Sequence, residues 1–354
     1  MNYKVLALED SEEWNDLLGQ LPINQQDVYF TPEYYSLYQN YGDGEACCFV
    51  FEHGGEIILY PFLKNSINRL GYKLDKKYFD IQGAYGYNGI VSSCNSKEFL
   101  ADFQQCFGQY CLENNIVAEF VRFHPLLENK ELVSENTKVI FDRKTISVDL
   151  TLPENDIWNI EITSKNRNHI CKAQKSGLEF YADYNFQYIN EFVALYNSTM
   201  NRVHAESFYY FSDEYYEDLV YRLKGHSFLG VILRRREVIA AAIFMYEGIY
   251  GHYHLSGSNK EHLNLCPNNL LIYEAAKELR NRGVKLFHLG GGTTSETDDP
   301  LFKFKHAFGR TENVFAIGKR IFNQEIYENI CDAWAIKFPE KVEKYKHFLL
   351  KYRY

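Results

Sequence analysis

The chain has 354 residues, of which 46% are hydrophobic and 24% are charged, a composition typical of a globular protein with a sizeable core. Its net charge of −9 argues against broad electrostatic attraction to nucleic acid, and no DNA partner is expected. No stretch approaches the roughly 18 uncharged apolar residues of a membrane-spanning helix. The eight cysteines have irregular spacing, so we expect reduced thiols, no bound metal and a cytoplasmic location.

The first half of the chain predicts a hairpin followed by a helix and a strand. Gly54 and Gly55 separate two apolar runs and form a turn of the length that joins antiparallel strands. A loop rich in glycine and tyrosine follows at 81–89. Residues 124–150 are polar, and we expect them to connect two domains. The predicted elements are strands at 45–52 and 56–63, a helix at 97–114 and a strand at 116–125.

The second half predicts the same order of elements. Short turns at 235–237 and 247–248 separate three apolar strands, and Pro267 and Gly283 mark the start and the end of the next helix. The predicted elements are helices at 187–200 and 212–223, strands at 227–234, 238–246 and 249–257, a helix at 267–282, a strand at 284–289, a short helix from 300, a strand at 312–322 and a helical tail from about 324.

This repeated order predicts an α/β (α+β) fold of two similar domains, at 1–150 and 151–323. The helical tail at 324–354 has apolar residues at helical spacing and could pack on the first domain or form a dimer contact. The sequence does not indicate the oligomeric state.

Five basic residues lie within eleven positions of the predicted helix that continues from 158 to 176. Lys165, His169 and Lys172 fall near one face, whereas Arg167 points elsewhere. Such a group is either a solvated basic face or an anion site for the phosphates of a substrate. Further on, Arg202 and His204 follow a helix and would share one side of an extended segment, as a polar wall of an acceptor groove or as a hydrogen-bonded surface loop.

The strand at 249–257 contains two histidines. Strict alternation would place His252 and His254 on one face and Tyr253 on the other. A histidine here could accept a proton from an amine, or it could be a hydrogen-bonded core residue. Ser256 and Ser258 end the strand with small side chains, where backbone amides could be exposed to a ligand.

Three glycines at 290–292 follow a strand but do not form a nucleotide-binding motif. Gly291 and Gly292 permit a close approach of the backbone to a ligand or to a neighbouring segment. Asp299 is a candidate N-cap of the short helix that follows. That helix carries Phe304, expected to pack inward, and Lys305, expected to face a substrate groove.

Four segments together resemble the Fem-type branch of the GNAT acetyltransferase superfamily, which includes the FemABX peptidoglycan-bridge aminoacyltransferases and related envelope acyltransferases. They are KNRNHICKAQKSG at 165–177, LYNSTMNR at 195–202, HYHLSGS at 252–258, and FHLGGG followed by DDPLFKFKHAFG within 287–309. These motifs are specific for the branch and do not specify the substrate.

The resemblance implies two tandem GNAT-like domains with mixed, mostly antiparallel sheets flanked by helices. Lys305 matches the lysine of the family motif L-x-x-F-K-x-x-F-G and would face the phosphates of the donor or the developing oxyanion. Lys165 and Arg167 match the family's basic helix, and Arg202 matches the arginine after a helix of the second domain. The other expected substrate-binding residues are His204, Ser256, Ser258, Gly291, Gly292 and Phe304.

The implied function is an N-acyltransferase that moves an acyl group from acyl-CoA to a primary amine of an amino sugar or an amino-acid-bearing envelope precursor. The acceptor would be a small molecule or a sugar or peptide linked to a nucleotide or lipid. Lys305, His254 and Tyr253 are the expected catalytic residues. The glycine-rich diphosphate loop of ordinary GNAT enzymes is replaced by SGSNKEHLNL, and a helical arm for transfer RNA is missing. An aminoacyl-tRNA donor and a non-catalytic sugar- or peptide-binding protein therefore remain alternatives.

Overall fold

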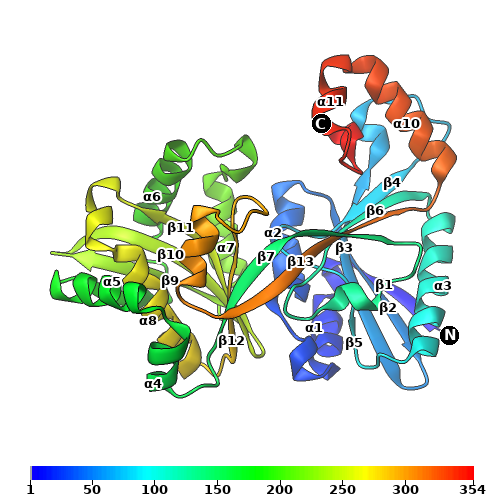
Figure 1. Cartoon of the computed structure of the whole chain (residues 1–354). Helices are drawn as coiled ribbons and strands as arrows, with labels where there is room; N and C mark the ends of the chain where they lie inside the picture. Colours follow the sequence, from blue (N-terminus) through cyan, green and yellow to red (C-terminus); the bar gives the residue numbers. More distant parts are fainter. Residues whose placement is uncertain (1) are drawn as a thin grey trace. The chain divides into compact units, whose positions relative to one another are not determined.

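The computed structural model describes residues 2–354, which form two compact units (Figure 1). The first unit comprises the chain up to Asp142 together with Phe315–Tyr354, and the second comprises Arg143–Val314. The C-terminal segment thus belongs to the first unit. Each unit is a mixed α/β fold and is described by itself.

In the first unit, four antiparallel strands follow one another and a fifth lies parallel to the fourth. The order is β1-β2-β3-β4-β6-β13, and β5 pairs with β3. The helix α3 lies in the connection between the parallel strands β4 and β6, as parallel pairing requires. The strands are β1 Asn2–Leu6, β2 Glu45–His53, β3 Glu56–Ser66, β4 Phe79–Gln82, β5 Val91–Ser92, β6 Ile116–Arg122 and β13 Thr311–Ile321. The helices are α1 Ser11–Gln20, α2 Pro32–Tyr41, α3 Lys97–Glu113, α10 Gln324–Lys337 and α11 Val342–Tyr345.

The second unit has the same order of strands. β8, β9, β10 and β11 pair antiparallel in sequence, and β12 lies parallel to β11 after the crossover helix α8. β7 closes the series against β12. The strands are β7 Lys138–Asp149, β8 Glu179–Asp183, β9 Ser227–Arg234, β10 Glu237–Glu247, β11 Tyr250–Ser258 and β12 Leu286–Gly291. The helices are α4 Glu154–Asp156, α5 Ser164–Lys175, α6 Ile189–Arg202, α7 Asp213–Arg222, α8 Pro267–Asn281 and α9 Pro300–His306.

The hairpins form at the predicted turns. Gly54 and Gly55 between β2 and β3 have φ of 65° and 88°, and Arg235 and Arg236 between β9 and β10 have φ of 51° and 71°. Two consecutive residues with positive φ match the right-handed twist of the flanking strands. The fold class predicted from the sequence, two tandem GNAT-like α/β units, is confirmed.

One expectation about the connecting region is wrong. Residues 124–150 are not a polar connection throughout, because Lys138–Asp149 forms the long strand β7. The first seven residues of β7 are exposed or partly buried and the next four are buried, so the polar composition of its first half concealed the strand.

Each unit has its own core. In the first, aromatic rings dominate, and Phe103 and Phe107 of α3 stack at 5.7 Å beneath Phe49 of β2. In the second, the apolar face of α8, including Leu271, packs against the strands. None of the helices within residues 2–354 combines the length and the apolar character needed to cross a membrane.

The C-terminal residues are fixed to the first unit by a buried ion pair. Asp80 of β4 accepts hydrogen bonds at one oxygen from Arg353 Nε and Tyr352 Oη, both at 3.0 Å, and Arg353 Nη2 pairs with its other oxygen. Burial raises the pKa of Asp80, although Arg353 opposes that shift. The arginine therefore compensates for a carboxylate that has left water.

Candidate active site

The parallel strands of the second unit separate before they end. β11 and β12 pair from Tyr250 opposite Leu286 to His252 opposite His288. β11 then continues to Ser258 and β12 to Gly291 outside this register. Ligands bind in α/β sheets at the carboxyl ends of parallel strands, where backbone groups become available. This opening is the candidate active site.

A β-bulge in β11 lies at the point of separation. Tyr253 is opposite Phe244 and Leu255 is opposite the adjacent Ile243, so His254 is an additional residue without a counterpart in β10. A bulge bends its strand and redirects side chains. Strict alternation along β11 is therefore interrupted at His254.

A second bulge lies in β12. His288 is opposite Ser147 of β7 and Gly290 is opposite the adjacent Ile146, which leaves Leu289 as the additional residue. Both strands are thus bent within two residues of the last pair between them. The two bulges account for the opening.

The side chains of β11 at this point have strongly shifted pKa values. Burial raises the pKa of Tyr253 to about 12, although a hydrogen bond with Ser256 acts in the other direction, so the phenol is neutral. Burial lowers the pKa of His254 to about 3, and the neighbouring His252 adds to the effect. His254 is thus a neutral imidazole and a weak base at neutral pH.

His288 was not among the sequence-predicted site residues. It is buried on β12, and its ring lies edge-on to that of His252 with centroids 5.7 Å apart. The available signal was the FHL segment at the end of the strand predicted next to HYH. Two buried histidines therefore lie at the base of the opening.

Helix α9 places Lys305 at the end of β12. Asp299 caps the helix by accepting the N–H of Phe302 at 2.9 Å, and it also accepts the N–H groups of Thr293 and Thr294. Burial opposes the ionisation of Asp299, but these hydrogen bonds hold its pKa well below the usual range. The predicted N-cap is present, and its carboxylate ties the loop after β12 to α9.

Lys305 is buried, with 9% of its surface exposed. Its Nζ donates a hydrogen bond to the carbonyl oxygen of Gly291 at 2.8 Å. Burial lowers the pKa of Lys305 to about 7; Asp299 opposes this shift and Arg143 adds to it. The pKa of this amine thus lies in the neutral range, and strongly shifted pKa values are common at catalytic sites.

The glycines of the loop allow this packing. A Cβ atom on Gly290, which has a φ of 78°, would lie 3.1 Å from Lys305 Nζ. A Cβ atom on Gly292 would lie 2.5 Å from Asp299 Oδ1. Gly291 and Gly292 themselves offer carbonyl groups to Lys305 and to Arg143, so they hold the lysine and the loop in place.

The basic residues of α5 have different environments. The predicted continuous helix from 158 is interrupted, because a π-helical turn Ile157–Glu161 ends before α5 begins. Arg167 Nη1 donates to the carbonyl oxygens of Trp158, Asn159 and Ile162 at 3.1, 3.3 and 2.6 Å, and so caps that turn. Lys165 is exposed.

Arg202 lies at the far end of β11. Its Nη1 donates to the carbonyl oxygen of Ser258 at 3.1 Å, and the N–H of Ser258 donates to Thr199 Oγ1 at 3.1 Å. The amide of Ser258 is therefore already engaged within the fold. Arg202 ends α6, and the exposed His204 follows in a turn with a φ of 52°, so the two do not alternate along an extended segment.

Phe304 is partly buried and lies with its ring 5.3 Å from that of Phe308, against the core of the second unit. The opening thus brings together Lys305 of α9, Gly291 at the end of β12 and Gly292 in the loop after it. A separate group on β11 contains Tyr253 with Ser256, and Ser258, which accepts a hydrogen bond from Arg202 of α6.

The segment between β11 and α8 differs from a glycine-rich diphosphate loop. Residues 259–266 contain no glycine, and Lys260–Leu265 forms a 3-10 helix. At the start of α8, Asn269 Nδ2 donates to Asn166 Oδ1 at 2.7 Å, and Pro267 offers no N–H. These residues do not fit the diphosphate of coenzyme A in the pose that such loops support.

The corresponding strands of the first unit stay closed. β4 and β6 pair up to Gln82 opposite Phe120, and a further parallel bridge joins Asn88 to Phe123. Asn88 N–H donates to the carbonyl oxygen of Arg122 at 2.6 Å, and its Oδ1 accepts the N–H of Arg122 at 2.9 Å. The loop after β4 thus fills the position at which the second unit is open.

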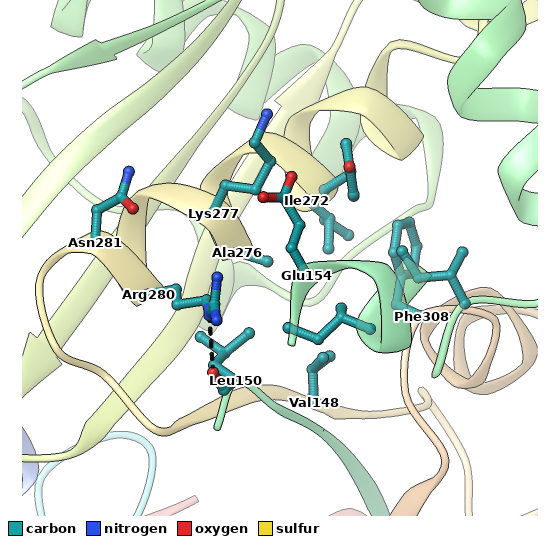
Figure 2. Close-up of a pocket in the computed structure, with 12 residues that line it drawn as sticks. Val148, Leu150, Glu154, Ile272, Ala276, Lys277, Arg280, Asn281 and Phe308 are labelled. Atoms are coloured by element: carbon teal, nitrogen blue, oxygen red, sulfur yellow. Dashed lines mark hydrogen bonds between the residues drawn. The ribbon is translucent and has the colours of Figure 1, made fainter. Parts of the chain in front are cut away.

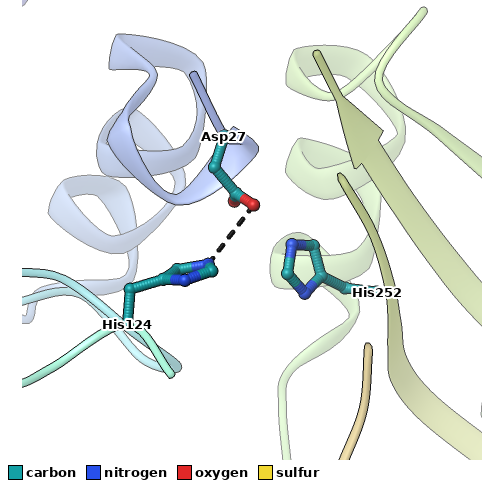
Figure 3. Close-up of side chains that lie close together, drawn as sticks. All are labelled: Asp27, His124 and His252. Carbon is teal, nitrogen blue, oxygen red and sulfur yellow. Dashed lines mark ion pairs between the residues drawn. The ribbon is translucent and has the colours of Figure 1, made fainter. Parts of the chain in front are cut away.

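Further side chains fix this loop. Asn129 Nδ2 donates to the carbonyl oxygens of Asn88 and Ile90, at 3.0 and 3.1 Å. His124, which follows Phe123 in the chain, is buried, and its Nε2 lies 3.3 Å from Oδ2 of the buried Asp27 (Figure 3). The first unit therefore presents a hydrogen-bonded closure here instead of a site.

The second unit has two parallel strands that are linked by a crossover helix and separate beside a bulge. These features define its fold as that of a GNAT-type transferase. Residues 164–306, within the second unit, match the family model of the acetyltransferase (GNAT) domain. Both units together are similar to the crystal structure of FemX, with a TM-score of 0.70, 15% identity, and coverage of 93% of this chain and 99% of that one. The resemblance to the Fem-type branch is confirmed at the level of the fold.

Two other solved structures are similar over most of their length. The L-PGS of Bacillus licheniformis has a TM-score of 0.54 and 13% identity, and the match covers 88% of this chain and 91% of that one. A conserved protein of unknown function from Bacteroides thetaiotaomicron has a TM-score of 0.55 and 9% identity, with coverage of 90% and 99%. The comparison with curated protein sequences gave no significant match. Identities this low establish a shared fold.

Proposed function

We propose that the protein is an N-acyltransferase whose active site is the opening between β11 and β12. The acceptor is a primary amine of an amino sugar or of an amino-acid-bearing envelope precursor, and the reaction takes place in the cytoplasm. The observation that carries the proposal is the position of Lys305, a buried amine with a pKa of about 7 held at the end of β12 beside the opening. In this proposal the catalytic region belongs to the C-terminal domain expected at 151–323.

The reaction joins the acceptor nitrogen to the acyl carbon. The amine lone pair attacks the carbonyl of a thioester or ester, and negative charge develops on the oxygen. Collapse of this intermediate forms the amide bond and breaks the bond to the leaving group. The nitrogen loses one proton and the leaving group gains one, so no oxidant or further reactant is required.

Lys305 serves in this proposal as the donor that stabilises the oxyanion. Its protonated amine has three N–H groups, and the bond to Gly291 uses one of them. Donors that are already oriented in a buried site stabilise such a charge strongly, since they need no reorganisation. Tyr253 has a pKa raised to about 12, so it stays neutral, and its O–H is a second hydrogen-bond donor near the bulge.

His254 is a poorer candidate for the proton acceptor than the sequence suggested. A general base works best with a pKa near the working pH, and the pKa of His254 is about 3. We therefore assign His254 the role of orienting a water molecule or the acceptor amine, with the proton passing to solvent or to the leaving group.

The test is a transfer assay on the full chain. Acetyl-CoA and longer acyl-CoA thioesters are combined with nucleotide-linked amino sugars and amino-acid amides, and mass spectrometry detects an acceptor heavier by one acyl group. Formation of an amide that depends on Lys305 supports the proposal. Tight acceptor binding with no product from any donor would instead identify a binding protein.

A second donor class is an aminoacyl ester of transfer RNA. The segment 259–266 lacks the glycines that hold the diphosphate of coenzyme A, so a donor without that group is also to be tested. Adding ribonuclease to a crude aminoacyl-tRNA pool distinguishes the two, because activity that depends on transfer RNA is lost and activity with acyl-CoA persists.

A further inference from the structure

A second cavity lies in the GNAT unit, away from the opening. Its volume is about 170 Å³, and α8, the turn that begins at α4, and β7 surround it (Figure 2). Val148, one of its lining residues, pairs with Phe287 near the start of β12, whereas the opening lies at the end of that strand.

The walls of the cavity are apolar and its rim is polar. Seven buried hydrophobic side chains line it: Val148, Leu150, Ile157, Ile162, Ile272, Ala276 and Phe308. The polar lining residues are Glu154, Tyr273, Lys277, Arg280 and Asn281. A dry apolar cavity of about 150 Å³ accommodates a molecule of the size of benzene, so a body of about six to eight non-hydrogen atoms suits this one.

The two cations of the rim differ in their partners. Lys277 Nζ lies 2.9 Å from Glu274 Oε2, so its charge is already neutralised. Arg280 Nε donates to the backbone carbonyl oxygen of Leu150 at 3.2 Å, and within residues 2–354 Arg280 has no carboxylate partner. In Figure 2 its guanidinium lies above Leu150 and Val148, at the edge of the apolar lining.

We propose that this cavity is a binding site for a small monocarboxylate with an aliphatic or aromatic body. The apolar body would fill the space between α8 and β7. The carboxylate would accept hydrogen bonds from Arg280, whose fork of N–H groups matches the geometry of a carboxylate. The bond from Nε to Leu150 fixes the guanidinium, and four N–H groups remain for the ligand.

The test uses the full chain and sodium hexanoate as the probe, with binding followed by calorimetry. Hexylamine carries an ammonium group in place of the carboxylate, and acetate lacks the apolar body. Hexanoate is expected to saturate one site, whereas hexylamine and acetate do not bind. Trp158 packs edge-on to the lining Tyr273 at 5.1 Å, so its fluorescence is expected to change with the same midpoint.

Two variants test the two halves of the site. Ala276→Leu fills the cavity, and Arg280→Gln removes the cation; each is expected to weaken hexanoate binding by about 10-fold or more, as the loss of a charged hydrogen bond or of the space predicts. Arg235→Gln removes an arginine from an exposed turn of the same unit and should leave binding unchanged. Thermal unfolding confirms that each variant is folded.

Lys305→Gln separates this site from the transfer site, because it should slow transfer strongly and leave hexanoate binding intact. The proposal is overturned if hexanoate does not saturate, if hexylamine binds as tightly, or if both cavity variants bind like the wild type. Loss of binding in Lys305→Gln with retention in folded Ala276→Leu would place the ligand at the opening and would also overturn it.

Discussion

Lys305 Nζ lies 2.8 Å from the carbonyl oxygen of Gly291, and this hydrogen bond joins α9 to the last residue of β12. The contact fixes a titratable amine at the point where the parallel strands have separated. Because the lysine is buried, its charge depends on pH in the neutral range. Three of the predictions below rest on this contact and on the glycine beside it.

Lys305→Gln is expected to reduce kcat/KM for acyl transfer by about 100- to 1,000-fold, the usual effect of removing one oriented oxyanion donor. Lys303→Gln is the matched control, because Lys303 is exposed on the same helix. Steady-state kinetics compares the two. Equal activity of both variants and the wild type would remove Lys305 from the mechanism.

The contribution of Lys305 should depend on pH. Its ammonium form predominates below its pKa of about 7 and is lost as the pH rises through that value. The ratio of wild-type to Lys305→Gln rates, which cancels ionisation of the substrate, should therefore be constant below pH 7 and fall by up to tenfold per unit above it. A ratio that rises with pH would identify Lys305 as the proton acceptor.

Gly290→Ala should impair activity more than stability. The left-handed backbone costs a residue with a Cβ about 1–2 kcal/mol. The new Cβ would also lie 3.1 Å from Lys305 Nζ and would push the amine away from its position. Gly177→Ala is the control, since Gly177 has a φ of 71° and open space around it. Both variants should lose similar stability in denaturant unfolding, and Gly290→Ala alone should lose transfer activity. Full activity of Gly290→Ala would show that the lysine tolerates displacement.

Arg353→Ala should destabilise the first unit by about 3 kcal/mol, because it leaves a carboxylate buried without its charge partner. Burial holds the pKa of Asp80 above its unfolded value, so the folded state of the variant takes up a proton as the pH falls. The destabilisation should thus be largest at neutral pH and shrink in acid. Asp80→Asn in the Arg353→Ala background should recover part of the loss, as measured by urea unfolding. A destabilisation that does not vary with pH would argue against this origin.

Local signals predicted much of the second unit. Pro267 and Gly283 delimit α8, and Asp299 caps α9, because proline, glycine and aspartate act within one turn of their own position. The bulge at His254 could not be predicted in this way. Its existence depends on the register between β11 and β10, and that register is a property of two strands.

The role of Arg167 was hidden for a related reason. Spacing in a continuous helix placed it among the bases of α5, but the π-helical turn Ile157–Glu161 creates carbonyl groups that this arginine caps. The shifted pKa of Lys305 also depends on burial, which no local pattern reports. The sequence thus predicted the residue types of the candidate site and not their electrostatic states.

The side chain of Asn88 has a consequence for how the two halves of the chain have specialised. Its Oδ1 accepts the N–H of Arg122, and the backbone N–H of Asn88 donates to the carbonyl oxygen of Arg122. Both backbone groups that a separated strand pair would offer to a ligand are therefore engaged. A repeat whose backbone groups are paired internally in this way is more rigid and offers no such groups to a ligand. Asn88→Ala would remove the acceptor of the Arg122 N–H and would leave the backbone bond to the Arg122 carbonyl oxygen in place. Since it would create no lysine beside that N–H, the first half would gain an open polar group and not a second active site.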